Sequence, residues 1–146
     1  MMEVRVQAEA FDVGAEMVAL TQGRGDIGAL VSFTGLVRGG AGDTLELEHY
    51  PGMTERRLVE IADVAETRWS LSSGLIVHRY GKLAAGELIV LVLAASPHRA
   101  DAFAAADYMM DMLKTNAPFW KKETSPGETR WVNARASDDA AAARWD

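Results

Sequence analysis

Apolar and polar positions follow short-period patterns along this chain, and these patterns predict seven β-strands. The clearest alternation is at 45–49, where Leu45 and Leu47 fall on one side and two glutamates on the other. That pattern is expected of a strand with one face in water. The stretch 87–95 is apolar on both sides, which predicts a central, covered strand. The predicted strands are 1–9, 28–37, 45–49, 75–80, 87–95, 119–123 and 129–132.

A spacing of three to four residues between apolar positions predicts helices elsewhere. A short helix is expected after Asp12, which suits its N-cap, and it ends near Gly23. A longer one is expected after Thr54, with Thr54 as its cap, and it ends before Gly74. The apolar stripe of the longer helix consists of Leu58, Ile61, Ala62, Ala65 and Trp69.

The longest predicted helix begins at Ser96 and Pro97, because serine suits the N-cap and proline the first helical position. Pro118 ends it. His98 and Arg99 place positive charge in the first turn, where the helix dipole disfavours it by roughly 0.3–1 kcal/mol. A cationic helix start is a suitable site for an anion. The expected apolar stripe is Phe103, Ala106, Met110 and Leu113, widened by Ala102 and Met109.

The order of these elements predicts an α+β fold. Strands and helices intermix, and tight connections favour antiparallel pairing; one hairpin is expected around 83–86 and another around the Pro126–Gly127 turn. No internal repeat or interdomain linker is visible, so we expect one domain over 1–135. The alanine-rich, acidic segment 136–146 is expected to be a loosely held tail.

Composition narrows the possible functions. The chain has 146 residues, 49% hydrophobic and 25% charged, which is enough for one domain with a proper core. It has no cysteine, so any sulfur chemistry must use sulfur from elsewhere. The net charge of -6 argues against general nucleic-acid binding. No signal peptide or membrane-spanning segment is visible, and we expect a cytoplasmic protein.

Charge changes sign locally between residues 114 and 135. A basic segment in an acidic protein suits a small anionic ligand or an acidic partner tail, although a solvated surface would give the same pattern. This segment holds five basic residues (Lys114, Lys121, Lys122, Arg130, Arg135) and two acidic ones (Glu123, Glu128).

Arg38 ends a predicted strand and is followed by three glycines within four residues. A guanidinium binds phosphate or carboxylate in a bidentate manner, and glycines let a ligand approach the backbone. His98 and Arg99 could also bind an anion. The alternatives are a surface arginine before a loop and a histidine that merely begins a helix.

Two lysines are candidates for acid–base chemistry. Lys114 lies at the end of the long helix, where the dipole favours a cation in any case. Lys121 and Lys122 point to opposite faces of a strand, so alternation places Lys121 beside Phe119. A lysine next to aromatic rings loses hydration, which lowers its pKa. The alternative is a lysine exposed at a sheet edge.

The sequence does not support a metal site or a cofactor site. The three histidines, His49, His78 and His98, lie in separate elements without ligand spacing, so we expect no metal and no bound cofactor. His98 and Lys114 are separated by about 24 Å along one helix, at 1.5 Å per residue. Both can serve one small ligand only if the site is shared between two subunits of a symmetric dimer.

Four segments together resemble a known family. They are 33–38 (FTGLVR), 47–53 (LEHYPGM), 96–99 (SPHR) and 113–123 (LKTNAPFWKKE), in the family's order and spacing. They closely resemble the large, catalytic subunits of molybdopterin synthase, the MoaE family. The likeness runs from about residue 3 to Arg135.

The resemblance implies an α/β hammerhead fold with an additional antiparallel β subdomain, and dimerisation through the large subunits. It implies transfer of sulfur to cyclic pyranopterin monophosphate, which becomes the dithiolene molybdopterin. The sulfur donor would be a small ubiquitin-like subunit with a Gly-Gly thiocarboxylate C-terminus, giving a heterotetramer.

The resemblance also assigns residues. It implies Lys114 and Lys121 as the catalytic pair. Substrate-binding positions would be Leu36, Val37, Arg38, His98, Arg99, Lys114, Lys121, Lys122 and Glu123, and Phe33 and Met110 would line the pocket. Two other functions stay open: a non-catalytic binding module for a ubiquitin-like partner, and an enzyme acting on another phosphorylated heterocycle without a protein partner.

Overall fold

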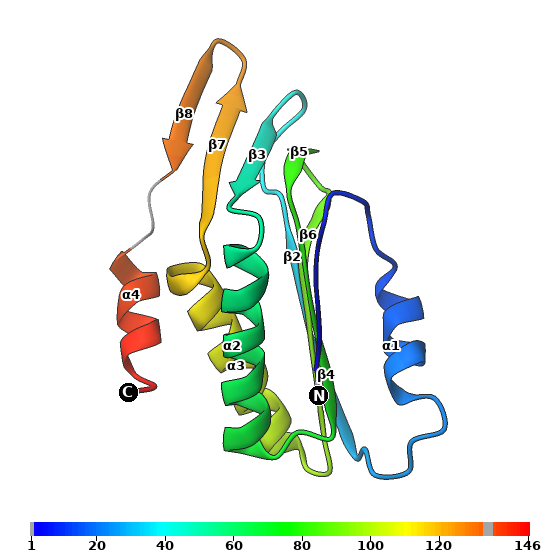
Figure 1. Ribbon diagram of the computed structural model, residues 1–146. Helices are drawn as coiled ribbons and strands as arrows, with labels where there is room; N and C mark the ends of the chain where they lie inside the picture. Colours follow the sequence, from blue (N-terminus) through cyan, green and yellow to red (C-terminus); the bar gives the residue numbers. More distant parts are fainter. Residues whose placement is uncertain (1, 133–135) are drawn as a thin grey trace.

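The computed structural model describes residues 2–132 and 136–146. It contains two four-stranded sheets, with helices on both faces of the first (Figure 1). The elements are β1 (Glu3–Gln7), α1 (Val13–Thr21), β2 (Ala29–Leu36), β3 (Thr44–His49), α2 (Met53–Trp69), β4 (Ser73–Arg79), β5 (Gly81–Ala84), β6 (Leu88–Ser96), α3 (Arg99–Asn116), β7 (Phe119–Ser125), β8 (Glu128–Val132) and α4 (Ala136–Ala143).

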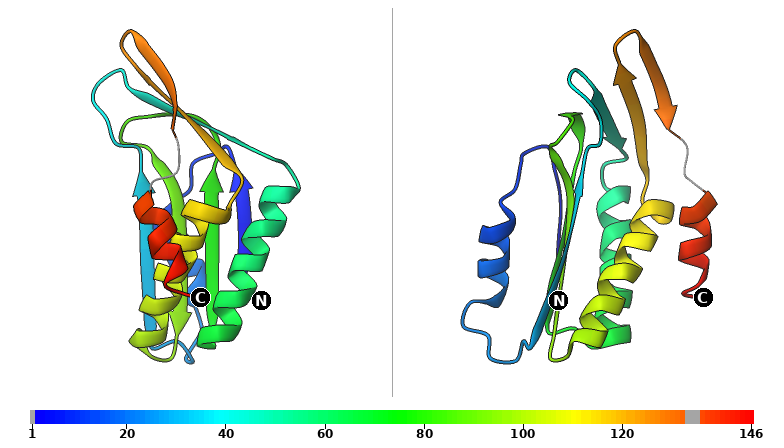
Figure 2. Two further views of the ribbon diagram at one scale, coloured as in Figure 1. Left: turned by 90° about the vertical axis from the view of Figure 1, so that its left-hand side faces the viewer. Right: turned by 180° about the vertical axis from the view of Figure 1, so that it is seen from behind.

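The first sheet has the strand order β1-β4-β6-β2, in which β1 runs parallel to β4 and the other pairs are antiparallel. Helices α2 and α3 cover one face and α1 covers the other (Figures 1 and 2). The apolar strand predicted at 87–95 is β6, an internal strand buried from Val90 onward. The prediction of a central strand is therefore confirmed, and two apolar clusters lie on opposite sides of the sheet.

The second sheet has the order β5-β3-β7-β8 and extends beyond the end of the first (Figure 2). Its core is a small cluster of Val37, Leu45, Leu47 and Leu83, with Phe119 packed against it. The alternation predicted for 45–49 is confirmed, because Leu45 and Leu47 are buried while Glu48 is exposed. The mixed α+β fold with an added antiparallel sheet is thus the one expected.

The hairpin predicted around 83–86 is only partly correct. Strands β4 and β6 do pair antiparallel, but the connection between them contains a further strand, β5, which pairs with β3 in the other sheet. Leu83 explains the difference, because it is 1% exposed and fills the core of the second sheet. Four residues are too short for a periodicity to predict a strand.

Both predicted caps of the longer helices are wrong. Helix α2 starts two residues earlier than expected, with Gly52 at its N-cap and Glu55 accepting a hydrogen bond from the Gly52 N–H. Thr54 instead lies buried inside the first turn and exchanges hydrogen bonds with the backbone of Tyr50. Ser96 is the last residue of β6, and His98 is the N-cap of α3.

The apolar stripe predicted for α3 is only partly correct, because Ala102, Ala106, Met109 and Leu113 are buried as expected but the other two members are not. Phe103 is 61% exposed, and Met110 is only half-buried. Alanines surround this helix on several sides, so the spacing of apolar residues alone did not determine its orientation. The residues that α3 buries are Ala102, Ala105, Ala106, Tyr108, Met109, Met112 and Leu113.

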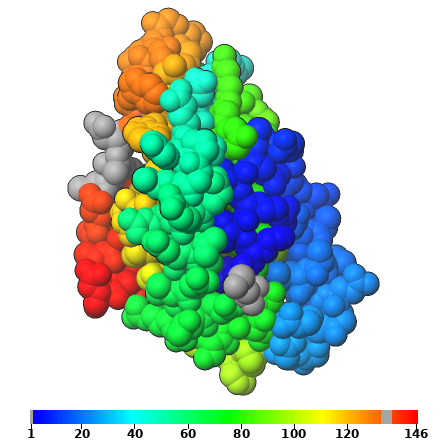
Figure 3. Space-filling model, viewed as in Figure 1, coloured from blue at the N-terminus to red at the C-terminus, as the bar shows by residue number. Residues whose placement is uncertain are grey.

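The expected loose tail is instead helix α4, which packs along α3 (Figures 1 and 3). Trp145 packs against the main core, with its ring 5.4 Å from Trp69 and 5.7 Å from Tyr108. Its indole N–H donates to the Asp111 carboxylate at 2.6 Å. An apolar anchor at the end of the segment thus outweighs the polar composition that suggested a free tail. None of the helices described here is both long and apolar enough to cross a membrane.

Candidate active site

A cavity of about 410 Å³ opens where the two sheets meet. Its walls come from segments that are distant in sequence: the end of β2, strands β3 and β7, the last turn of α3 and the first turn of α4. The side chains around it include Leu36, Val37, Arg38, Asp43, Leu45, Ile89, Lys114, Phe119, Lys121, Glu123, Val132 and Asp138. Polar groups therefore share this space with a few apolar ones, as in sites that bind small polar ligands.

Strand β7 supplies Lys121 through simple alternation. Phe119, Lys121 and Glu123 face the cavity, as the period of two predicts. Lys121 lies opposite Leu47 of β3 and Val132 of β8, so it has neighbouring strands on both sides. Lys114 enters from the last turn of α3, and Pro118 lies between that helix and β7. The turn at Pro118 brings the two lysines to one cavity.

The Lys121 ammonium is partly removed from water. The pKa of Lys121 is lowered to about 8, first by burial and then by the charge and hydrogen bonding of Lys114, while Asp138 and Glu123 act in the opposite direction. With a pKa of about 8, roughly a tenth of the side chains are neutral at pH 7, compared with well under a thousandth for an ordinary lysine. Lys121 can therefore both bind an anion and exchange a proton near neutral pH.

His78 lies behind Lys121 and carries no charge. Its ring stacks on Phe119 with centroids 3.8 Å apart, and its Nδ1 donates to the Arg79 carbonyl at 2.8 Å. The pKa of His78 is lowered to about 4, mainly by burial and to a smaller extent by the charges of Lys121 and Lys114. A neutral imidazole here supports Phe119 without adding a further positive charge beside the lysines. The sequence alone assigned His78 no role, since no spacing pattern connects it with position 119.

The end of β2 forms the opposite wall. A register shift between Gly35 and Leu36 turns the strand, and the buried Val37 exchanges backbone hydrogen bonds with Gly86 and Glu87. Arg38 follows as an exposed side chain at the rim, and no hydrogen bond or ion pair joins it to another described residue. Its guanidinium is therefore free to bind a ligand.

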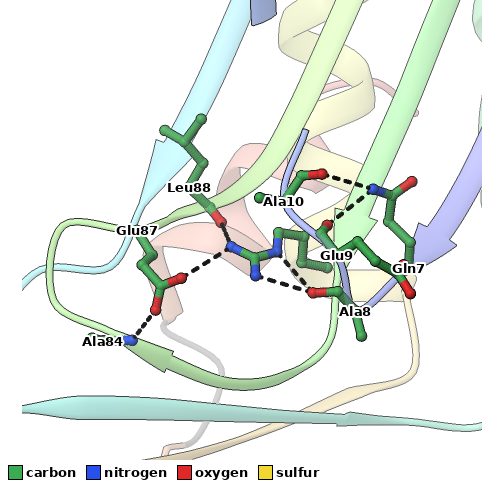
Figure 4. A network of polar contacts seen from close by, with 8 residues as sticks. Gln7, Ala8, Glu9, Ala10, Ala84, Glu87 and Leu88 are labelled. Carbon is green, nitrogen blue, oxygen red and sulfur yellow. Dashed lines mark hydrogen bonds and ion pairs between the residues drawn. The ribbon is translucent and has the colours of Figure 1, made fainter. Parts of the chain in front are cut away.

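A buried arginine holds this wall in place. The guanidinium of Arg79 donates to the carbonyls of Ala8 and Leu88 at 3.0–3.1 Å, and it lies 3.5 Å from the Glu87 carboxylate (Figure 4). Glu87 in turn accepts a hydrogen bond from the Ala84 N–H (Figure 4). This network ties the turn that pairs with Val37 to the end of β1.

The cavity collects some of the residues expected from sequence and leaves others elsewhere. Leu36, Val37, Arg38, Lys114, Lys121 and Glu123 line it. Lys122 points to the other side of β7, where its ammonium lies 3.6 Å from Glu46 and 5.4 Å from the centre of the Trp131 ring. Glu123 also pairs with Arg130 at 3.1 Å.

The remaining expected residues lie along α3 and β2. His98 and Arg99 are exposed at the start of α3, at the opposite end from Lys114. Phe33 lies on β2, 41% exposed, and Met110 packs beside the main core. Within one chain, these four do not join the cavity lining. Arg135, part of the predicted basic segment, falls outside the described residues.

The described residues contain no cluster of histidine, aspartate or glutamate suited to a metal ion. Two charged lining residues were missed by sequence reasoning, Asp43 in the loop after β2 and Asp138, the latter because 136–146 was interpreted as a tail. The only signal for Asp138 in the sequence was an acidic residue at the start of a short alanine-rich helix.

Comparison with known proteins identifies the family of this chain. The family model for MoaE protein matches residues 6–116. The chain belongs to the MoaE family. It is 56% identical to the molybdopterin synthase catalytic subunit of Mesorhizobium japonicum, over 97% of this chain and 92% of that protein.

Solved structures extend the comparison to three dimensions. The molybdopterin biosynthesis MoaE protein from Burkholderia ambifaria superposes with a TM-score of 0.86 at 51% identity, covering 99% of this chain and 98% of that one. A chain in the complex of subunits 1 and 2 of molybdopterin-converting factor from Helicobacter pylori has a TM-score of 0.73 at 19% identity, covering 90% and 91%. This second likeness concerns the fold alone. The MoaE resemblance seen in the sequence is confirmed.

Proposed function

We propose that this chain is the catalytic subunit of a molybdopterin synthase. It transfers sulfur from the thiocarboxylated C-terminus of a small ubiquitin-like subunit to cyclic pyranopterin monophosphate, forming the molybdopterin dithiolene. Each transfer leaves a carboxylate on the small subunit, so an oxygen from water replaces each sulfur. The names of full-length relatives at about half identity support this function. The absence of cysteine from the chain agrees with an imported sulfur.

The observation that carries the proposal is the Lys114–Lys121 pair in one cavity with Arg38. A thiocarboxylate tail and a phosphorylated pterin are both anions, and a pocket with three cationic side chains can bind both. The two lysines orient the thiocarboxylate and stabilise the oxyanion that forms when its carbonyl is attacked. Lys121, with a pKa of about 8, also moves protons at neutral pH. Arg38 binds the phosphate or the pterin.

The partner and the assembly are part of the same proposal. The Helicobacter pylori structure of this fold is a complex of two subunits, which supports a small-subunit partner here. His98, Arg99, Phe33 and Met110 would serve a second copy's cavity in a homodimer at the centre of a heterotetramer. For His98 and Arg99 this follows from the length of α3, about 24 Å between His98 and Lys114 at 1.5 Å per residue, whereas Phe33 and Met110 are included on the family resemblance. A symmetric dimer in which His98 stays far from both Lys114 side chains would contradict the shared site. We place the reaction in the cytoplasm.

The test is sulfur transfer itself. The chain is mixed with thiocarboxylated small subunit and cyclic pyranopterin monophosphate, and molybdopterin is followed as its oxidised fluorescent derivative. Wild type is compared with Lys121→Ala and with Lys82→Ala, an exposed lysine on β5 outside the cavity. We expect product from wild type and Lys82→Ala, and a loss of at least about 100-fold in Lys121→Ala, the scale of a lost acid–base group.

Other outcomes separate the alternatives. Equal product from Lys121→Ala would keep the function and move the essential role to Lys114 or to another residue. No product from wild type, with the small subunit still bound, would favour the non-catalytic binding module. Turnover by this chain without any small subunit would favour an enzyme acting on another phosphorylated heterocycle.

A further inference from the structure

Helix α4 brings an acidic side chain to the cationic cavity. Asp138 lies in its first turn and lines the same cavity as Lys114 and Lys121. We propose that Asp138 is a positioning residue that acts through Lys121, as the carboxylate that keeps the buried ammonium protonated, and that the C-terminal anchor of α4 holds it there. This inference rests on the proposed function.

The far end of α4 is fixed to the body of the protein by several polar contacts. The Trp145 indole and the Arg144 guanidinium both donate to Asp111 of α3, and Arg144 also lies 2.7 Å from Asp107. The Trp145 carbonyl accepts a hydrogen bond from Arg68 of α2 at 3.0 Å. With its end tied to two core helices, α4 presents its first turn to the cavity in one orientation.

The first turn of α4 also provides a matched control residue for Asp138, the neighbouring Asp139. Asp138 and Asp139 carry the same charge at adjacent positions, but Asp138 is half-buried at the cavity and Asp139 is exposed outside it. A helix turns by about 100° per residue, so neighbouring side chains point in different directions. A role that depends on position rather than on total charge must therefore distinguish these two aspartates.

Charges of both signs face Lys121 from the surrounding elements. The positive ones are Lys114 from α3 and Arg38 from the end of β2, and the negative ones are Glu123 from β7, Asp43 from the loop after β2 and Asp138 from α4; His78 of β4 is neutral. Glu123 is partly engaged by Arg130. Asp138 is therefore well suited to oppose the burial and the Lys114 charge that both favour the neutral amine.

The experiment measures the protonation of Lys121 directly. Competitive acetylation with acetic anhydride, followed by mass spectrometry of the Lys121 peptide across pH, gives the midpoint at which the amine becomes reactive. It is run on the full chain as wild type, Asp138→Asn, Asp138→Glu and Asp139→Asn. We expect Asp138→Asn to lower the midpoint by about 0.3–1 pH unit, because an opposite charge that favoured the ammonium is lost. Asp138→Glu should restore most of the shift, and Asp139→Asn should leave the midpoint unchanged.

The same variants are assayed for sulfur transfer in complex with thiocarboxylated small subunit. The limb of the pH–rate profile that reports Lys121 should move to lower pH in Asp138→Asn by the same amount as the labelling midpoint. Trp145→Ala, with its helix content checked by circular dichroism, should shift the midpoint in the same direction because the anchor of α4 is weakened.

An unchanged midpoint in Asp138→Asn, or an equal shift in Asp139→Asn, would overturn the inference. The labelling does not depend on turnover, so the two proposals fail separately. If Asp138→Asn shifts the labelling midpoint but the wild-type protein makes no molybdopterin, the role of Asp138 is supported and the enzyme function is rejected. If the wild-type protein makes molybdopterin but Asp138→Asn leaves the labelling midpoint unshifted, the enzyme function is supported and the role of Asp138 is rejected.

Discussion

Lys121 should lower the stability of the protein at neutral pH, and its replacement by methionine should reveal by how much. Its pKa falls from the ordinary value of 10.5 to about 8 in the folded chain, mainly because of burial. Between these values the unfolded chain binds more protons than the folded one, so stability rises with pH across this window. Below pH 8 the folded state carries the full cost of a partly buried ammonium.

The size of the effect follows from the two pKa values. At 1.36 kcal/mol per pH unit, the cost approaches about 3 kcal/mol at pH 7 and falls to about 1 kcal/mol at pH 10. Methionine is a long, uncharged side chain that can lie along the same wall beside Phe119. We therefore expect Lys121→Met to be more stable than wild type at pH 7 by about 1–3 kcal/mol, with most of the gain gone at pH 10.

The measurement is urea unfolding of both proteins from pH 7 to pH 10, because urea leaves the ionic strength unchanged. The control is Lys122→Met on the opposite face of β7, where the lysine lies beside Glu46 and should give no comparable gain at pH 7. Lys121→Met should also be inactive in sulfur transfer, which would make Lys121 a case of stability given up for function. A gain that is absent at pH 7, or that grows toward pH 10, would refute the assignment of a buried, destabilising ammonium.

Two further substitutions test the framework around the cavity. Gly28→Ala should lower the melting temperature sharply, because a Cβ would lie 2.2 Å from the Pro97 carbonyl oxygen; a melting temperature within a degree of wild type would contradict this packing. Arg79→Met should destabilise the protein by about 3 kcal/mol in urea unfolding, because the carbonyls of Ala8 and Leu88 lose a charged donor. A loss below about 0.5 kcal/mol would show that water satisfies those carbonyls equally well.

The sequence by itself determined the elements whose pattern is strict. Period-two alternation correctly separated Lys121 from Lys122 on β7, and it correctly buried Leu45 and Leu47. The continuous apolar run of β6 identified the central strand. Such patterns survive folding because they repeat the geometry of the backbone itself.

Helix orientation depended on contacts that the sequence does not encode locally. Alanines occupy several sides of α3, so the helix could pack in more than one rotation, and the other core elements selected the face with Met109 rather than Phe103. The short strand β5 likewise exists because β3 offers it a partner. Helix α4 is held by the contacts of Trp145 with two other helices.

The candidate site likewise has some features that the sequence predicted and others that only the tertiary structure set. Lys114 and Lys121 lie seven residues apart, and the sequence singled out each as a candidate, but only the family resemblance joined them in one site. Arg38 and Asp138 approach them from distant parts of the chain, and His78 supports Phe119 from a neighbouring sheet. Local residue types determined which groups could carry charge. Only the packing of two sheets and of helices α3 and α4 decided which charges share one partly dry cavity, and hence which pKa values shift.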